Sequence, residues 1–179
     1  VKELQALNAK LKFQADHDSL TGLNNRGYFQ KKFKTAFNKN LSSKSNLCCL
    51  LLDLDHFKKV NDDYGHAFGD LVLQNFAGIL SRVKRSTDIA ARYGGEEFVL
   101  LMPETTLDEA TSLARTLSAE TENFVHKKGK TTLQVTISSG LAALVDHKPK
   151  NPDKLLSMAD KALYQAKKNG RNRVEVYSP

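Results

Sequence analysis

The sequence lacks the features typical of membrane-spanning, exported and nucleic-acid-binding chains. No apolar run approaches the ~20 residues that cross a bilayer, and the N-terminus has no apolar signal-peptide core. The only two cysteines, Cys48 and Cys49, are adjacent, a spacing that suits neither a metal site nor a disulfide framework. Zinc-finger spacing and an aromatic RNA-binding box are also missing. We therefore expect a cytoplasmic domain with two buried, reduced thiols and no nucleic acid polymer as partner.

What the chain has in excess is positive charge. Lysine and arginine outnumber aspartate and glutamate by 27 to 20, for a net charge of +7, with basic clusters at residues 31–34, 127–130 and 167–171. Such charge suits a phosphate-rich partner without choosing between a polymer and a nucleotide. The 179 residues are enough for one domain. Because the chain begins with Val1, we expect a longer protein with a sensor region or a membrane anchor upstream.

Hydrophobic periodicity predicts an alternation of helices and strands. A short amphipathic helix, the end of a linker or coiled coil, is expected over 1–17. Further helices are expected at 25–38, 65–83, 107–124 and 152–169, and a loop at 39–46. Strands are expected at 47–54, at 132–137 and, at the edge of the sheet, over 173–177. A hairpin is expected at 88–102. The strand at 132–137 is followed by a break at 138–140, and 141–145 is its expected hairpin partner. This order predicts an α+β fold, with helices around a central, mostly antiparallel sheet.

An acidic pair follows a Gly-Gly turn. Gly94 and Gly95 separate two strand-like runs, which predicts a tight hairpin whose turn uses positive φ. Glu96 and Glu97 come directly after the glycines and suit a hard divalent cation. The alternative interpretation is a solvated turn that carries two surface glutamates.

A third carboxylate, Asp53, lies at the end of the apolar run 47–54. An unpaired charge at the end of a buried strand is costly, and a metal ion would offset that cost. If the hairpin pairs beside this strand, Asp53 meets Glu96 or Glu97 at one edge of the sheet. The alternative is that Asp53 caps the next helix.

A phosphate site is expected just after Asp55. If a helical turn starts there, its free N–H groups suit phosphate oxygens, and Lys58 adds a cation at the same place. The alternative for Lys58 is a solvated lysine.

Two polar side chains farther along suit a purine. The amide of Asn61 both donates and accepts hydrogen bonds, as a purine edge requires. The carboxylate of Asp70 is able to accept from the N–H and amino groups of guanine, and adenine offers no such pair. A helix-capping role is the alternative for Asp70.

Five motifs occur in a fixed order along the chain. They are DSLTGLNNR at 18–26, DLDHFK at 53–58 followed by Asn61 and Asp62, GHAFGD at 65–70, RYGGEEF at 92–98, and DKALYQAK with GRN between 160 and 172. Together they resemble the motifs of the GGDEF domain of diguanylate cyclases, in its GGEEF form, over nearly the whole of 18–173.

The resemblance implies a palm-like nucleotidyl cyclase fold, with a catalytic domain at 18–179 and a signalling helix at 1–17. It implies that two GTP condense to c-di-GMP and two pyrophosphates by metal-assisted attack of a 3′-hydroxyl on an α-phosphate. Each protomer would hold one GTP, so a homodimer is required. The implied cofactor is Mg²⁺, two ions per half-site, with Mn²⁺ as a substitute.

The resemblance also assigns residues. Asp53, the Leu54 carbonyl, Glu96 and Glu97 would bind metal, and the choice of Glu96 or Glu97 as base stays open. Lys58, Lys167 and Arg171 would hold phosphates and transition-state charge, which gives Lys58 a catalytic role as well. The implied substrate-binding set is Phe57, Lys58, Asn61, His66, Asp70, Lys167 and Arg171.

An RxxD sequence, from Arg85 to Asp88, precedes the Gly-Gly turn by five residues. It resembles the inhibitory site of the family, so we expect c-di-GMP to bind there as an inhibitor. Arg115 is expected to assist, although Thr116 stands where some members carry a second arginine. The alternative is a surface salt bridge.

Two other functions compete with an active cyclase. One is a catalytically silent GGDEF module that binds GTP or c-di-GMP as a receptor, although the acidic pair and the lysines that such modules lose are present. The other is an enzyme of relaxed base choice, which the presence of Asp70 disfavours.

Overall fold

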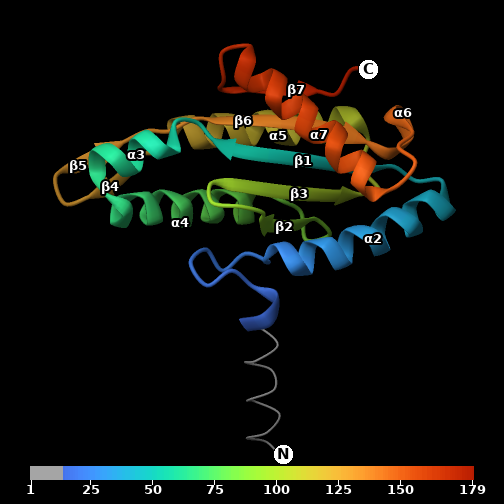
Figure 1. The fold of residues 1–179 in the computed structure, drawn as a ribbon, viewed down its shortest axis with the longest axis horizontal. Helices are drawn as coiled ribbons and strands as arrows, with labels where there is room; N and C mark the ends of the chain where they lie inside the picture. Colours follow the sequence, from blue (N-terminus) through green and yellow to red (C-terminus); the bar gives the residue numbers. More distant parts are fainter. Residues whose placement is uncertain (1–13) are drawn as a thin grey trace, which may run out of the picture.

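The computed structural model describes residues 14–179, which form one central sheet covered by helices on both faces (Figure 1). The sheet has five strands in the order β2-β3-β1-β6-β7, and only the β6–β7 pair is parallel. Its strands are β1 Leu47–Leu54, β2 Ile89–Arg92, β3 Glu97–Pro103, β6 Ile137–Ala143 and β7 Arg173–Val176. A separate hairpin pairs β4 His126–Lys128 with β5 Thr131–Leu133. The predicted α+β class with a mostly antiparallel sheet is confirmed.

Each face of the sheet packs on its own set of helices. The helices are α2 Arg26–Ser43, α3 Phe57–Tyr64, α4 His66–Val83, α5 Leu107–Asn123, α6 Leu144–His147 and α7 Pro152–Lys168. Helices α3, α4 and α5 cover one face, and α2 and α7 cover the other. Within residues 14–179, no helix is long and apolar enough to cross a membrane.

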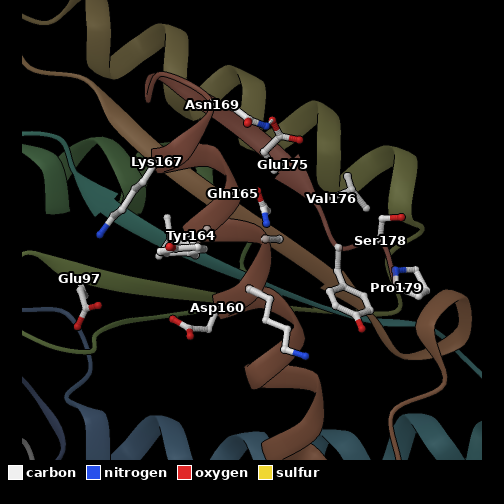
Figure 2. A pocket seen from close by; sticks show the side chains of 14 residues that line it. Glu97, Asp160, Tyr164, Gln165, Lys167, Asn169, Glu175, Val176, Ser178 and Pro179 are labelled. Atoms are coloured by element: carbon white, nitrogen blue, oxygen red, sulfur yellow. Dashed lines mark hydrogen bonds between the residues drawn. The ribbon is translucent and has the colours of Figure 1, made fainter.

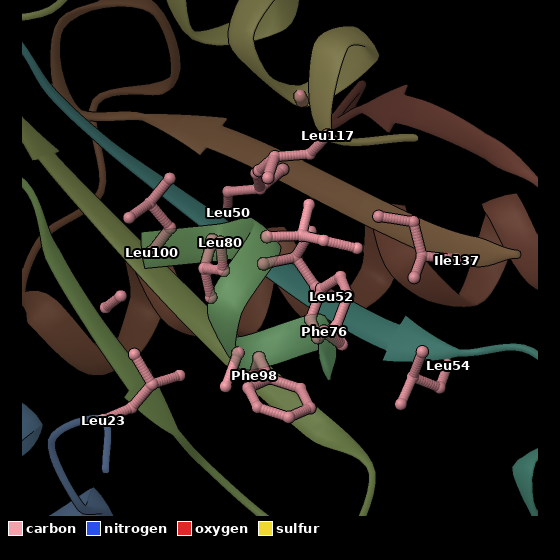
Figure 3. Close-up of a cluster of buried hydrophobic side chains, with 14 of the residues drawn as sticks. Leu23, Leu50, Leu52, Leu54, Phe76, Leu80, Phe98, Leu100, Leu117 and Ile137 are labelled. Carbon is pink, nitrogen blue, oxygen red and sulfur yellow. The ribbon is translucent and has the colours of Figure 1, made fainter. Parts of the chain in front are cut away.

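The last residues of the central strand β1 point alternately to the two faces of the sheet. Side chains alternate along a strand, so Leu50, Leu52 and Leu54 pack toward α4 and α5 (Figure 3). Leu51 lies in the cluster on the other face, with α2 and α7. Asp53, two residues after Leu51, therefore belongs to the α7 face of the sheet.

Helix α2 is longer than the sequence predicts, and the loop expected at 39–46 is confined to 44–46. The stripe of Phe33 and Phe37 continues at Asn40, which is buried although polar. Its side-chain amide donates to the Ala36 carbonyl, 2.8 Å away. The helix ends at Ser43, and the left-handed C-cap residue Lys44 donates its N–H back to the carbonyls of Asn40 and Leu41.

The break expected at 138–140 and the hairpin partner expected at 141–145 are also wrong, because β6 runs without interruption beside β1 from Ile137 to Ala143 and α6 begins at Leu144. The strand expected at 132–137 ends instead at Leu133, in the hairpin with β4 that the sequence did not predict. Gly140 serves packing: a Cβ there would lie 2.1 Å from the Ala159 carbonyl oxygen and 2.1 Å from the Leu163 nitrogen. Helix α7 therefore packs directly on the backbone of β6.

The other expected elements are confirmed. Strand 47–54, the hairpin strands and the helices near 65–83 and 107–124 appear as predicted. Asn151 caps α7 with Pro152 in its first turn, and Gly170 follows the helix with φ of 107°. The helix expected over 1–17 falls largely outside the described residues, of which 14–16 are helical.

The contact of α7 with β6 predicts that Gly140→Ala destabilises the domain. The new methyl group meets backbone atoms that cannot rotate away, so we expect a loss of about 3 kcal/mol in the free energy of unfolding. Gly78→Ala is the matched control, because it lies in α4 with open space around it. There the same change should stabilise by up to about 1 kcal/mol. Urea unfolding measures both, and equal effects would contradict the packing argument.

Candidate active site

Two carboxylates lie side by side where β1 ends. Asp53 is the register partner of Glu97 on β3 and of Ser138 on β6. The backbone N–H of Leu54 donates to the Glu96 carbonyl, 3.3 Å away. The predicted pairing of the hairpin beside β1 is therefore confirmed, and it brings Asp53 to the acidic pair.

The turn before the acidic pair differs from the prediction. The N–H groups of Tyr93 and Gly94 both donate to the Glu97 carbonyl, at 2.8 and 3.1 Å. Neither Gly94 nor Gly95 has positive φ, so the expected reason for the glycines is wrong. A Cβ on Gly94 would lie 2.5 Å from the Glu97 carboxylate. The missing side chain at Gly94 thus leaves room for Glu97.

Arg92 holds this turn to the start of the domain. Its Nε and Nη2 donate to the Gly95 carbonyl at 3.1 and 2.8 Å. Its Nη1 also pairs with the Asp18 carboxylate at 3.3 Å. The Thr21 backbone and hydroxyl donate to the same carboxylate. The motif at 18–26 therefore braces the hairpin that carries the two glutamates.

The carboxylates at this edge are short of compensating charge. Burial raises the pKa of Asp53, although the Lys167 ammonium opposes the shift from 2.8 Å and Arg171 adds to the opposition. Burial also raises the pKa of Glu97, and the Asp53 carboxylate adds to that rise. A cation between these carboxylates would relieve both effects.

The donor set fits Mg²⁺. Carboxylate oxygens are hard ligands, and Mg²⁺ is commonly held by one or two carboxylates together with substrate phosphates. Within the described part of the chain, no three or more acidic, histidine or cysteine side chains form a group that could hold a metal ion. Asp53 and Glu97 would therefore supply only part of a coordination shell.

A hollow of about 660 Å³ extends from Glu97 along α7 (Figure 2). Glu97, Asp160 and Lys167 lie at one end of it in the close-up. Asp160 was not predicted as a site residue, yet its charge also raises the pKa of Glu97. This end of the hollow therefore carries three charged groups beside the turn.

The start of α3 supplies backbone donors next to Asp53. Helix α3 begins at Phe57, and its N-cap residue His56, at φ of 57°, makes no side-chain capping bond. The first-turn N–H groups therefore lack the side-chain acceptor that usually satisfies them. Lys58 is exposed in the same turn. This arrangement suits phosphate oxygens.

The predicted guanine-reading residues lie on two helices, α3 and α4, that pack together. Asn61 comes from α3, and His66 and Asp70 are exposed near the start of α4. A Cβ on Gly69 would lie 1.9 Å from the Asn61 side-chain oxygen and 3.2 Å from the Phe57 ring. Gly69 thus allows this close approach, a role that the sequence analysis missed.

The RxxD residues form a tight ion pair. Asp88 accepts from Nη2 of Arg85 at 2.9 Å, from its Nε, and from its backbone N–H at 2.8 Å. The Asp88 side chain is fully buried, whereas that of Arg85 is 42% exposed. Asp88 therefore orients Arg85 and does not itself face solvent. Arg115 lines a hollow with Asn172 and Arg173, and neither Arg85 nor Asp88 is among the residues that line it.

Comparison with known proteins identifies the family. The family model described as "Diguanylate cyclase, GGDEF domain" matches residues 15–173. The response regulator PleD of Caulobacter vibrioides is 40% identical over 88% of this chain and 35% of its own length. The probable diguanylate cyclase DgcE of Escherichia coli is 36% identical over the whole chain, which spans 16% of DgcE. The chain thus covers about a third or less of these relatives.

Solved structures agree with the fold. The coiled coil and GGDEF domain of DgcB from Caulobacter crescentus, in complex with c-di-GMP, has a TM-score of 0.91 at 30% identity, covering 98% of this chain and 92% of that one. The active GGEEF domain of a diguanylate cyclase from Vibrio cholerae has a TM-score of 0.82 at 30% identity, covering 87% and 97%. This chain belongs to the GGDEF family of diguanylate cyclase domains.

Proposed function

We propose that this domain condenses two GTP molecules into c-di-GMP and two pyrophosphates. The observation that carries the proposal is the pairing of Asp53 with Glu97, beside Lys167 and the uncapped start of α3. The carboxylates that would hold a metal then lie at one edge of the sheet. The cations and the backbone N–H groups that would hold phosphates lie at the same edge. That combination suits phosphoryl transfer.

Asp53, the Leu54 carbonyl, Glu96 and Glu97 would hold Mg²⁺. The bound ions would neutralise phosphate charge and acidify the attacking 3′-hydroxyl. Lys167 now pairs with the Asp53 oxygen at 2.8 Å, so we infer that it turns to the phosphates when Asp53 binds metal. Lys58 and Arg171 would complete the positive lining, and Glu96 or Glu97 would accept the proton.

The base would be read between α3 and α4. The Asn61 amide and the Asp70 carboxylate offer the acceptors and donor that match guanine, with His66 and Phe57 beside them. Adenine lacks the paired donors that Asp70 would meet. GTP is therefore the proposed substrate, and an ATP-derived mixed product is disfavoured.

One protomer would hold one GTP, so two protomers must face each other for attack. The proximity of two half-sites then controls the rate. An upstream segment that brings two copies together would activate the domain, consistent with a signalling role for residues 1–17.

The proposed site predicts that Glu97→Gln abolishes c-di-GMP formation. Loss of the carboxylate removes a metal ligand and a candidate base, so we expect a fall of roughly 10³-fold in rate. Glu120→Gln is the matched control, because Glu120 is half-exposed on α5 and pairs with Arg82 on the surface. The readout is chromatography and mass of nucleotides after incubation with GTP and Mg²⁺.

Wild-type rate in Glu97→Gln would contradict the assignment. A wild-type protein that binds GTP or c-di-GMP and forms no product, even when dimerised by a fused zipper, would instead support the silent receptor module.

We also propose product inhibition through Arg85. Its guanidinium is fixed by the buried Asp88 and remains partly exposed, which suits a phosphate or a guanine edge. Arg85→Ala should raise the inhibition constant for c-di-GMP about tenfold, as expected for the loss of charged hydrogen bonds. Arg82→Ala, on the surface of α4, should leave it unchanged. Equal inhibition of Arg85→Ala and wild type would remove Arg85 from the inhibitory site.

A further inference from the structure

Asp55 is a buried carboxylate that the proposed mechanism does not use. It follows the last residue of β1 and is 5% exposed. One of its oxygens accepts from the Ser138 hydroxyl at 2.6 Å. The other accepts from the Thr136 hydroxyl at 2.7 Å and from the Asn172 backbone N–H at 3.0 Å. Three donors thus fix this carboxylate between β6 and the turn after α7.

The turn that Asp55 holds has an unusual backbone. Arg171 and Asn172 are consecutive non-glycine residues with positive φ, 63° and 46°. Such conformations persist only where the surroundings enforce them. The Arg171 N–H donates to the Ala166 carbonyl at 2.9 Å, and the Asn172 side chain donates to Glu122 at 3.1 Å. Glu122 is exposed, so Asp55 is the buried anchor of the turn.

We propose that Asp55 is a positioning residue that fixes the Arg171 turn, and with it the guanidinium, for the phosphates of GTP. The inference rests on the proposed function of Arg171. Arg171 lies close enough to Asp53 to lower the pKa of that carboxyl, in opposition to burial. Because the backbone of the turn is held before binding, less conformational entropy is lost when Arg171 meets the ligand, and this favours affinity.

The test compares two variants and two ligands by calorimetric titration. Asp55→Asn replaces one acceptor oxygen with an amide nitrogen, whereas Ser138→Ala removes one bond to Asp55 and leaves the Asn172 bond in place. The ligands are 3′-deoxy-GTP, which lacks the attacking hydroxyl, and guanosine, which lacks phosphates. We expect Asp55→Asn to weaken 3′-deoxy-GTP about tenfold and guanosine not at all. Ser138→Ala should change neither, and guanosine binding reports the folded fraction of each sample.

A double-mutant cycle separates positioning from general support. If Asp55 acts through Arg171, adding Asp55→Asn to Arg171→Ala should cause no further loss of 3′-deoxy-GTP affinity. Equal weakening of both ligands by Asp55→Asn, or full additivity with Arg171→Ala, would overturn the inference.

A measurement on the wild-type protein covers the case in which Asp55→Asn does not fold. The Asn172 amide should exchange slowly with solvent, because its hydrogen is donated to a buried carboxylate. Exchange at the rate of a free amide would overturn the inference. Slow exchange in a protein that binds no 3′-deoxy-GTP would keep Asp55 as the anchor of the turn and reject the proposed function instead.

Discussion

The arrangement of the site depends on two carboxylates that the sheet forces together. Antiparallel pairing of β1 with β3 makes Asp53 and Glu97 neighbours, and burial raises the pKa of both. Two such groups are costly unless a cation lies near them. The Lys167 ammonium meets part of that need at 2.8 Å. The same need makes this edge suitable for a divalent ion with phosphates.

The remaining structure serves to hold that edge. Alternation along β1 turns Leu54 toward α4 and α5 and assigns Asp53 to the face of α7, which carries Lys167. Gly140 lets α7 approach the sheet closely, and Arg92 ties the Gly-Gly turn to the segment at 18–26. The ends of α3, α7 and the hairpin thereby meet at one place although they are far apart in sequence.

Much of the fold and of the site was predictable, because it depends on residues that are close together in the sequence or that belong to the motifs. The apolar run of β1, the cap of α7 and the convergence of Asp53 with the hairpin follow from periodicity and turn chemistry. Close approaches were not predictable from spacing. Gly94 and Gly69 leave room for the Glu97 and Asn61 side chains, and Gly140, which the sequence suggested as part of a break, instead lets α7 pack on β6. The three donors to Asp55 likewise come from segments distant in the chain.

The most direct test is the rate of c-di-GMP formation per protomer as the protein concentration is raised at saturating GTP and Mg²⁺. Because each acidic edge would hold one GTP, the account predicts a rate per protomer that rises with concentration. When the domains are dimerised by a fused zipper, the rate per protomer should no longer depend on protein concentration. A constant rate per protomer at all concentrations, with and without the zipper, would contradict the two-half-site mechanism.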